Sequence, residues 1–353
     1  MIDLGSVVTR VDAELATFFD TRAGRLAELG DDLSALAEIA RSFVLDGGKR
    51  LRPMFAYCGW RAVRGSSGDT PMITAAASLE LLHGCALIHD DVMDGSGTRR
   101  GRPSIHAAFA AMHARDAFTG DSRVFGTAAA IVVGDLLLSW ADAMFAGAGF
   151  SSADGSRART VYDDMRQQVM AGQYLDMLVQ ARGHFSVEDA QRVAEYKTSK
   201  YTVEGPLQFG AAAAGAAPEV VTALRGYGLP LGEAFQLRDD VLGVFGDPGR
   251  TGKPIGDDLR EGKRTMLVAL AMDAAKPEQA GLLRAGLGNR DLDDAGAAAL
   301  CDVIVATGAL DRVEARIAER TARARAALDT PAISDDTRDV LDGLAVLATE
   351  RHT

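Results

Sequence analysis

Residues 79–101 read LELLHGCALIHDDVMDGSGTRRG and carry the strongest fold signal in the chain. Apolar residues recur at helical spacing and glycines follow, which predicts a helix that ends near Met93. Positions i and i+4 share a helix face, so Asp90 and Asp94 should project together while Asp91 points about 100° away. Two carboxylates on one face suit Mg²⁺, which binds oxygen ligands and leaves other positions to water and substrate phosphate. The competing interpretation is a solvated helix end with an incidental acidic cluster.

The composition is that of an ordinary globular protein. Of 353 residues, 47% are hydrophobic and 25% charged, and a net charge of −11 argues against general binding to nucleic acids or anionic membranes. The three cysteines form no CxxC pair, which argues against a zinc site or a disulfide framework and fits a reducing cytosol. The N-terminal residues lack the basic start and the apolar core of a signal peptide. Apolar runs such as 127–134 are shorter than a membrane span, which needs about 18 residues. We expect a soluble, cytoplasmic protein.

Apolar periodicity predicts an all-α fold with breaks at glycine, proline and Ser/Asp clusters. The expected helices cover residues 7–29, 33–45, 51–63, 72–93, 105–114, 125–146, 158–181, 187–200, 220–245, 263–275, 297–307, 310–328 and 336–350. No linker is long enough to separate two domains. We therefore expect one domain over residues 1–353, with a core at about 43–267 and looser C-terminal helices at about 278–353.

A second acidic pair repeats the pattern of the first. The segment FQLRDDVLG, residues 235–243, places Asp239 and Asp240 in an apolar helix that again runs into a glycine-rich basic loop. The position four residues after Asp239 is Gly243, so this face has one carboxylate fewer.

Basic residues cluster at structural breaks in this acidic chain. Arginine forks suit phosphate, and glycine lets a phosphate approach the backbone closely. Acidic pairs together with basic glycine loops indicate two diphosphates, one bound through metal and one directly. The basic residues are Lys49, Arg50, Arg52, Arg99, Arg100, Lys253, Lys263 and Arg264.

Motifs of other enzyme classes are missing from the sequence. There is no GxSxG, HExxH or Walker-type GxxxxGK[ST] element, and no strand precedes the glycine-rich loops as a dinucleotide-binding fold requires.

Six motifs in order resemble the trans (E-type) isoprenyl diphosphate synthases, or polyprenyl synthetases, and most of all bacterial geranylgeranyl diphosphate synthases. They are GGKRLRP, LELLHGCALIHDDVMDGSGTRRG, GQYLD, YKTSKYT, FQLRDD and GKPIGDDLREGKRT, and they span roughly residues 43–267. The resemblance implies an isoprenoid-synthase-type helical bundle around a deep central cavity. It also implies a homodimer.

The resemblance assigns roles to individual residues. Asp90, Asp94 and Asp239 would bind Mg²⁺, about three ions per active site with Mn²⁺ as a substitute, while Asp91, Asp240 and Asp176 would act through water or through the ligands. Isopentenyl diphosphate would contact Lys49, Arg52, His83 and Arg100. The allylic diphosphate would contact Arg99, Lys197, Lys253, Lys263 and Gln173, and Thr198 and Gln236 would face its reacting carbon. His89 and Cys85 are expected to be structural, and without the resemblance His83 would be read as a core histidine.

The implied reaction is Mg²⁺-dependent head-to-tail prenyl transfer between isopentenyl diphosphate and an allylic diphosphate of dimethylallyl, geranyl or farnesyl type. Product length should depend on the helix before Asp90. The resemblance implies that the growing chain runs beside this helix, where Cys85 and Ala86 are small. The floor of its tunnel would therefore drop from Cys85 to Leu82, three residues or about 4.5 Å lower, with Leu79 as the next position on that face. Roughly one additional C5 unit favours geranylgeranyl diphosphate (C20), with farnesyl diphosphate (C15) as the alternative.

Two further functions compete with this interpretation. A class I terpene cyclase usually needs an asparagine-led second metal motif, and Asn289, the single asparagine, lies in no such pattern. A non-catalytic regulatory subunit would not need the intact acidic and basic motifs. Because Asp239 is present, we expect Gly243→Asp to leave activity unchanged or raise it modestly.

Overall fold

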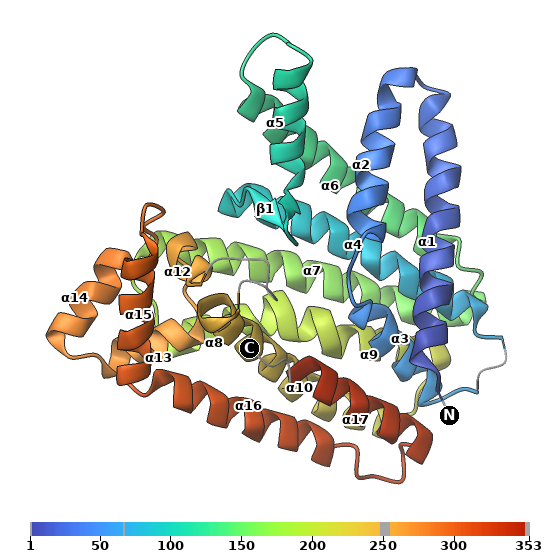
Figure 1. The fold of residues 1–353 in the computed structure, drawn as a ribbon. Coiled ribbons are helices and arrows are strands. Elements are labelled where there is room, and N and C mark those ends of the chain that lie inside the picture. Colours follow the sequence, from blue (N-terminus) through green and yellow to red (C-terminus); the bar gives the residue numbers. More distant parts are fainter. Residues whose placement is uncertain (1, 66–67, 248–254, 350–353) are drawn as a thin grey trace. The chain divides into compact units, whose positions relative to one another are not determined.

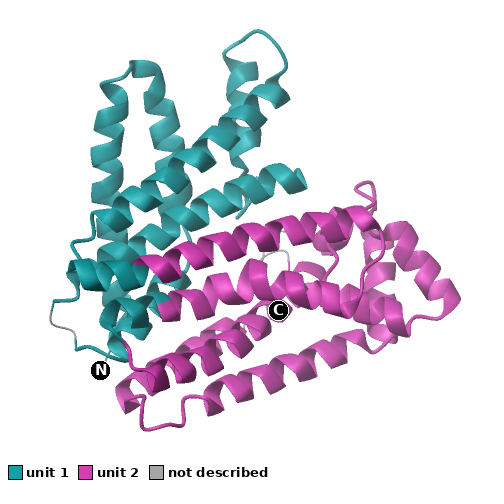
Figure 2. Cartoon of the chain, turned by 180° about the vertical axis from the view of Figure 1, so that it is seen from behind, with its two compact units in different colours: residues 1–158, 209–215 teal, residues 159–208, 216–353 magenta. Residues whose placement is uncertain are grey.

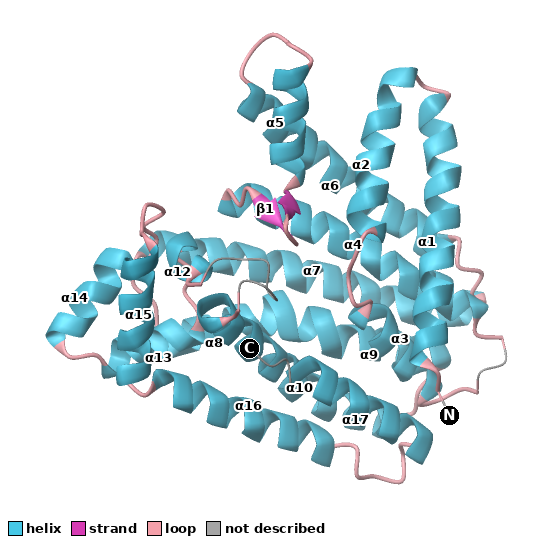
Figure 3. Cartoon of the chain, in the orientation of Figure 1, coloured by secondary structure: helices cyan, strands magenta, loops and turns pink. Residues whose placement is uncertain are grey.

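The computed structural model describes residues 2–65, 68–247 and 255–349, and Figure 1 shows their path. Lys253 lies outside these residues. The described chain is helical apart from one short hairpin, which confirms the all-α prediction (Figure 3). Two compact units are formed, residues 1–158 with 209–215 and residues 159–208 with 216–353 (Figure 2). We describe each by itself, as unit 1 and unit 2.

Unit 1 is built on α4, whose residues from Met72 to Ile88 are almost all buried. The packing partners of α4 include α1, which presents the buried stripe Val7, Val11, Leu15 and Phe19 at a spacing of four residues. Its elements are α1 (Leu4–Ala27), η1 (Asp31–Leu33), α2 (Ser34–Leu45), α3 (Leu51–Arg61), α4 (Thr70–Asp94), β1 (Thr98–Arg99), β2 (Arg102–Pro103), α5 (Ile105–Arg115) and α6 (Ser122–Ala146). The helices α7 (Ser152–Arg182) and α9 (Gly205–Ala214) contain residues of both units.

Unit 2 surrounds α10, whose buried residues form one cluster with side chains of α13, α15 and α16. Glycines bring α10 against the π-helix η2, because a Cβ at Gly232 would lie 2.5 Å from Ser199 Cα and one at Gly228 would lie 2.7 Å from Glu204 Cα. The elements are α8 (Val187–Val193), η2 (Ala194–Glu204), α10 (Pro218–Phe245), α12 (Asp257–Glu261), α13 (Met266–Ala274), α14 (Pro277–Gly286), α15 (Asp294–Ala306), α16 (Ala309–Ala326) and α17 (Asp335–Thr349).

The structure differs from the predicted helices in three places. The helix expected over 187–200 is α-helical only to Val193 and continues as a π-helix to Glu204. The predicted loop TRRG forms a hairpin, in which Thr98 pairs with Pro103 and Arg99 with Arg102. The short helices α9, α12 and α14 were not predicted, and α9 shows why. Its Gly210 does not break the helix but allows close packing, since a Cβ there would lie 1.8 Å from the Ala56 carbonyl oxygen.

Two helices, α4 and α6, are long and apolar enough to cross a membrane by length and composition alone. Core helices pass the same test, and 72% of the apolar window of α4 is buried, against 39% for α6. The search of the sequence for uninterrupted apolar runs did not detect α4 or α6 as candidate membrane spans. These two helices do not by themselves show a transmembrane segment.

Candidate active site

In unit 1, the first acidic segment closes α4 and meets the hairpin that follows it. The helix ends at Gly95, whose φ of 64° is the left-handed conformation that glycine adopts readily. The hairpin places Arg99 beside the carboxylates of the last turn of the helix. Arg99 Nη2 lies 2.6 Å from Asp91 Oδ1 and 3.5 Å from Asp90 Oδ2.

Asp91 and Asp90 have different surroundings although they are adjacent. The side chain of Asp91 is 1% exposed and accepts hydrogen bonds from Arg99 Nε at 2.8 Å, whereas that of Asp90 is 19% exposed. Burial raises the pKa of Asp91, and the ion pair with Arg99 opposes that effect. Asp94 is also partly exposed, so Asp90 and Asp94 are the accessible carboxylates and Asp91 anchors the arginine.

The basic loop before α3 is fixed by one buried arginine. Arg50, 4% exposed, adopts a φ of 51° and lies 2.7 Å from Asp12 Oδ1 and 3.0 Å from Glu80 Oε2. Its Nη1 also donates to the Gly47 carbonyl at 2.9 Å. Arg50 therefore holds the loop, while Lys49 is exposed and Arg52 half-buried on the first turn of α3.

Replacing Arg50 by methionine should cost about 3–5 kcal/mol of stability, because Glu80, itself 4% exposed, would keep a buried charge without its partner. Chemical unfolding measures this loss. The matched control is Arg41→Met, whose partner Asp20 is 71% exposed, and its cost should be about 0–1 kcal/mol. Equal losses for the two variants would show that the Arg50 cluster does not stabilise unit 1.

Positive charges surround His83 on α4. A Cβ on Gly47 would lie 3.2 Å from Arg100 Nη1, so Arg100 lies over the glycines of the loop. Burial lowers the pKa of His83 well below its usual value, and the charges of Arg52, Arg100 and Arg99 lower it further. The imidazole of His83 is therefore neutral and feels the charges of Arg52 and Arg100, and the binding of isopentenyl diphosphate by these residues stays a prediction.

In unit 2, η2 carries Lys197 and contacts α7 at a glycine. A Cβ on Gly172 would lie 2.4 Å from the Lys197 amide nitrogen, so the two helices approach closely beside Gln173. Lys197 Nζ lies 2.6 Å from Asp176 Oδ2, and Gln180 donates to the other oxygen of that carboxylate at 3.2 Å. The GQYLD and YKTSKYT motifs therefore meet through an ion pair.

A polar chain links η2 to the second acidic segment. Thr198 Oγ1 donates to Gln236 Oε1, and Gln236 Nε2 donates to Asp240 Oδ1 at 2.6 Å. Asp240 is 5% exposed, and its pKa is raised to about 8, mainly by burial and also by the carboxylates of Asp258 and Asp239, while the hydrogen bond from Gln236 opposes the shift. Thr198 and Gln236 are thus oriented by a buried carboxyl group, while Asp239 remains partly exposed.

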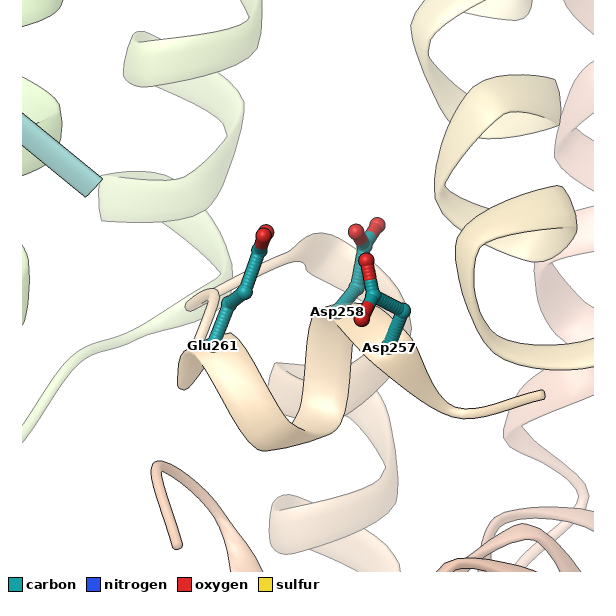
Figure 4. A group of neighbouring side chains, drawn as sticks. All are labelled: Asp257, Asp258 and Glu261. Atoms are coloured by element: carbon teal, nitrogen blue, oxygen red, sulfur yellow. The ribbon is translucent and has the colours of Figure 1, made fainter. Parts of the chain in front are cut away.

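The short helix α12 adds three carboxylates that sequence reasoning did not assign. Asp257, Asp258 and Glu261 point to the same side of α12 (Figure 4), and one oxygen of each lies within 4.8 Å of the others. Lys263 Nζ lies 2.8 Å from Asp258 Oδ1 and 2.9 Å from Glu261 Oε2. Burial opposes the lysine charge, but the two carboxylates outweigh it and raise its pKa well above the usual value. In the sequence, the motif GDDLREGK at residues 256–263 already showed these three carboxylates next to a lysine.

The donor chemistry fits Mg²⁺. Asp90, Asp94 and Asp239 offer carboxylate oxygens that are partly exposed, and these are the ligands that this cation prefers. The raised pKa of the buried Asp240 has Asp258 and Asp239 among its causes, so negative charge is concentrated there and a cation would relieve it.

Comparisons with known proteins agree with this chemistry. The polyprenyl synthetase family matches residues 34–304. This chain belongs to the polyprenyl synthetase family. It is 36% identical over 310 residues to a geranylfarnesyl diphosphate synthase from Aeropyrum pernix, covering 86% of this chain and 91% of that one. It is 33% identical over 337 residues to the octaprenyl diphosphate synthase of Escherichia coli, covering 93% and 94%.

Solved polyprenyl synthetase structures give the same result for the fold. A geranylgeranyl pyrophosphate synthase from Corynebacterium glutamicum, complexed with isoprenyl diphosphate and magnesium, is similar with a TM-score of 0.96 and 43% identity. The match covers 99% of this chain and 100% of that one. The isoprenoid-synthase-type helical fold is therefore confirmed.

Proposed function

We propose that this chain condenses isopentenyl diphosphate with allylic diphosphates head-to-tail, depends on Mg²⁺ and makes geranylgeranyl diphosphate (C20) as its main product. The observation that carries the proposal is the arrangement at the end of α4. There Arg99, paired with the buried Asp91, lies beside the accessible Asp90, and arginines surround a neutral His83 on the same helix. Accessible carboxylates beside fixed cations suit one diphosphate bound through metal and another bound directly.

Asp90, Asp94 and Asp239 would hold Mg²⁺, which when bound supplies Lewis-acid stabilisation to a diphosphate leaving group. Arg99 would bind the same diphosphate, because its contact with Asp91 fixes the guanidinium while Nη2 stays 3.5 Å from Asp90. A fixed arginine needs no reorganisation as charge develops on the leaving group.

Lys197, Thr198 and Gln236 would act on the allylic substrate from unit 2. Lys197 would bind its diphosphate, and the pairing of Lys197 with Asp176 at 2.6 Å holds the ammonium in position. The Thr198 and Gln236 oxygens would stabilise positive charge on the allylic carbon. The double bond of isopentenyl diphosphate attacks that carbon, the carbon–oxygen bond to diphosphate breaks, and a proton leaves the new chain.

Lys49, Arg52, His83 and Arg100 would bind isopentenyl diphosphate. The pKa of His83 is lowered, so the imidazole stays neutral near neutral pH and the arginines carry the charge. A neutral histidine can donate or accept a hydrogen bond without adding to the repulsion among the arginines.

The C20 assignment rests on α4. Ala86 is small and lies four residues before Asp90 on the same helix face, with Leu82 and Leu79 further down the helix, whereas the small Cys85 beside it is buried. The Corynebacterium glutamicum protein, 43% identical, is named a geranylgeranyl pyrophosphate synthase, whereas the relatives named geranylfarnesyl and octaprenyl diphosphate synthases are 36% and 33% identical. Farnesyl diphosphate remains the alternative product.

A homodimer in the cytoplasm is the proposed form of the protein. One face of α6 exposes Val124 (68%), Ile131 (43%) and Val132 (55%), and a second copy would cover such an apolar stripe. Cys58, Cys85 and Cys301 are all free thiols, which fits a reducing compartment.

One assay tests the proposed function. The purified protein is incubated with isopentenyl diphosphate and each allylic primer (C5, C10 and C15), with Mg²⁺ or with a chelator, and the products are sized. We expect a linear C20 diphosphate that forms only with Mg²⁺. Cyclised hydrocarbons would support a terpene cyclase instead, and a folded protein without turnover would support a regulatory subunit.

A further inference from the structure

The second acidic segment lacks a carboxylate at Gly243, but the carboxylate of Asp258 fills the space beside this glycine. A Cβ on Gly243 would lie 1.8 Å from Asp258 Oδ2 and 2.4 Å from Asp258 Cγ. Gly243 is four residues after Asp239, so the two share a face of α10. The carboxylate of Asp258 therefore lies on the face that carries Asp239, one helical turn further along.

Asp258 cannot move aside without losing contacts. It is 8% exposed, and Lys263 Nζ lies 2.8 Å from its Oδ1. The start of α12 is tied to α10, because the Gly256 amide donates to the Val244 carbonyl at 3.1 Å. The Lys263 amide also donates to the Asp258 carbonyl at 3.0 Å. Any side chain at position 243 must displace this fixed carboxylate and weaken its ion pair with Lys263.

We propose that Asp258 supplies the carboxylate that the second acidic segment lacks at Gly243. There is space for one carboxylate at this place, and in this chain it comes from Asp258 of α12 and not from position 243 of α10. Lys263 is the positioning residue, since it binds Asp258. This inference rests on the proposed Mg²⁺-dependent function, for which the face of Asp239 would bind metal.

The proposal changes one expectation from the sequence. Gly243→Asp should be harmful, because its Cβ alone collides with Asp258. Lys263 pairs with Asp258 and Glu261, and its contact with the allylic diphosphate stays a prediction.

The test is a carboxylate exchange. Mg²⁺ affinity is measured by calorimetry in the presence of inorganic diphosphate for the parent protein, Gly243→Asp, Asp258→Gly and the double variant Gly243→Asp/Asp258→Gly. Each single variant should bind Mg²⁺ at least about tenfold more weakly, which is the usual effect of losing a supporting group at a metal site. The double variant should return to within about threefold of the parent.

Three controls separate a carboxylate effect from a steric one. Gly243→Ala/Asp258→Ala also removes the collision but restores no carboxylate, so its Mg²⁺ affinity should stay low. Asp273→Ala removes an exposed carboxylate of α13 outside this cluster and should change the affinity less than about threefold. Lys263→Met should weaken Mg²⁺ binding as Asp258→Gly does, and Lys263→Arg should restore part of it. Melting temperatures are recorded for every variant.

Two results would refute the role proposed for Asp258. One is a Gly243→Asp variant that binds Mg²⁺ as tightly as the parent, and the other is a double variant whose loss of Mg²⁺ binding free energy equals the sum of the losses in the single variants. Turnover of the parent protein is measured separately. A parent protein that binds Mg²⁺ and diphosphate but makes no product would refute the proposed function, while the conclusion about Asp258 and Gly243 would still stand.

Discussion

Replacing Asp90 by alanine is expected to lower turnover at least about a thousandfold, because metal stabilisation of the leaving group is worth several kcal/mol and each 1.36 kcal/mol changes the rate tenfold. The fold of unit 1 should survive. The distance from Asp90 to Arg99 is 3.5 Å, while the contact that holds Arg99, to Asp91, is 2.6 Å and stays intact. Product formation and the melting temperature are measured on the same preparation.

Two other variants test whether this loss is specific. Asp164→Ala removes an exposed carboxylate of α7 and should leave turnover within about twofold of the parent. Asp91→Ala removes a carboxylate that is 1% exposed and should lower the melting temperature, because Arg99 loses its partner. An Asp90→Ala protein that keeps its turnover would refute the assignment of this residue as a metal ligand.

Local rules were enough to predict which carboxylates at the end of α4 share a helix face. The spacing of Asp90, Asp91 and Asp94 on a helix fixes which carboxylates share a face, and the structure shows the middle one buried and the outer two accessible. The fold class followed in the same way from helical periodicity, together with the resemblance carried by the ordered motifs.

The remaining features depend on contacts between residues distant in sequence. Arg50 reads as a phosphate ligand within GGKRLRP, yet Asp12 and Glu80, which bind it, lie 38 and 30 residues away along the chain. Lys263 reads as a substrate-binding cation in its motif, and the motif does not show the contacts with Asp258 and Glu261 that hold it in the structure. A motif shows which charges are present, but tertiary packing decides which of them are neutralised within the protein.

The transition from α-helix to π-helix at Ala194 escaped prediction for a similar reason. Apolar periodicity does not distinguish the two helix types over so short a segment, whereas packing against Gly172 and Gly232 constrains the backbone of η2. The predicted helices over 158–181 and 220–245 already run through these two glycines. In the structure, α7 and α10 each contact η2 at one of these glycines, so closely that a Cβ there would collide with the backbone of η2.

Replacing Ala86 by phenylalanine is expected to shorten the main product from C20 to C15. Ala86 lies four residues before Asp90 and shares its helix face, and it is partly exposed. The next residue down this face is Leu82, so a ring at position 86 would raise the floor of the tunnel by about 6 Å, roughly one isoprene unit. Chromatography of the dephosphorylated products measures the shift.

Cys85→Phe provides the matched control, because the structure separates two neighbours that the sequence treated together. Cys85 is 5% exposed, and its Sγ lies 3.8 Å from Nδ1 of His89, whose ring packs against Gly134 of α6. A ring at this position should overpack the contact between α4 and α6, cost about 1–3 kcal/mol of stability and leave the product at C20. If both variants shorten the product equally, or if Ala86→Phe still makes C20, the face of α4 that carries Asp90 does not set the chain length.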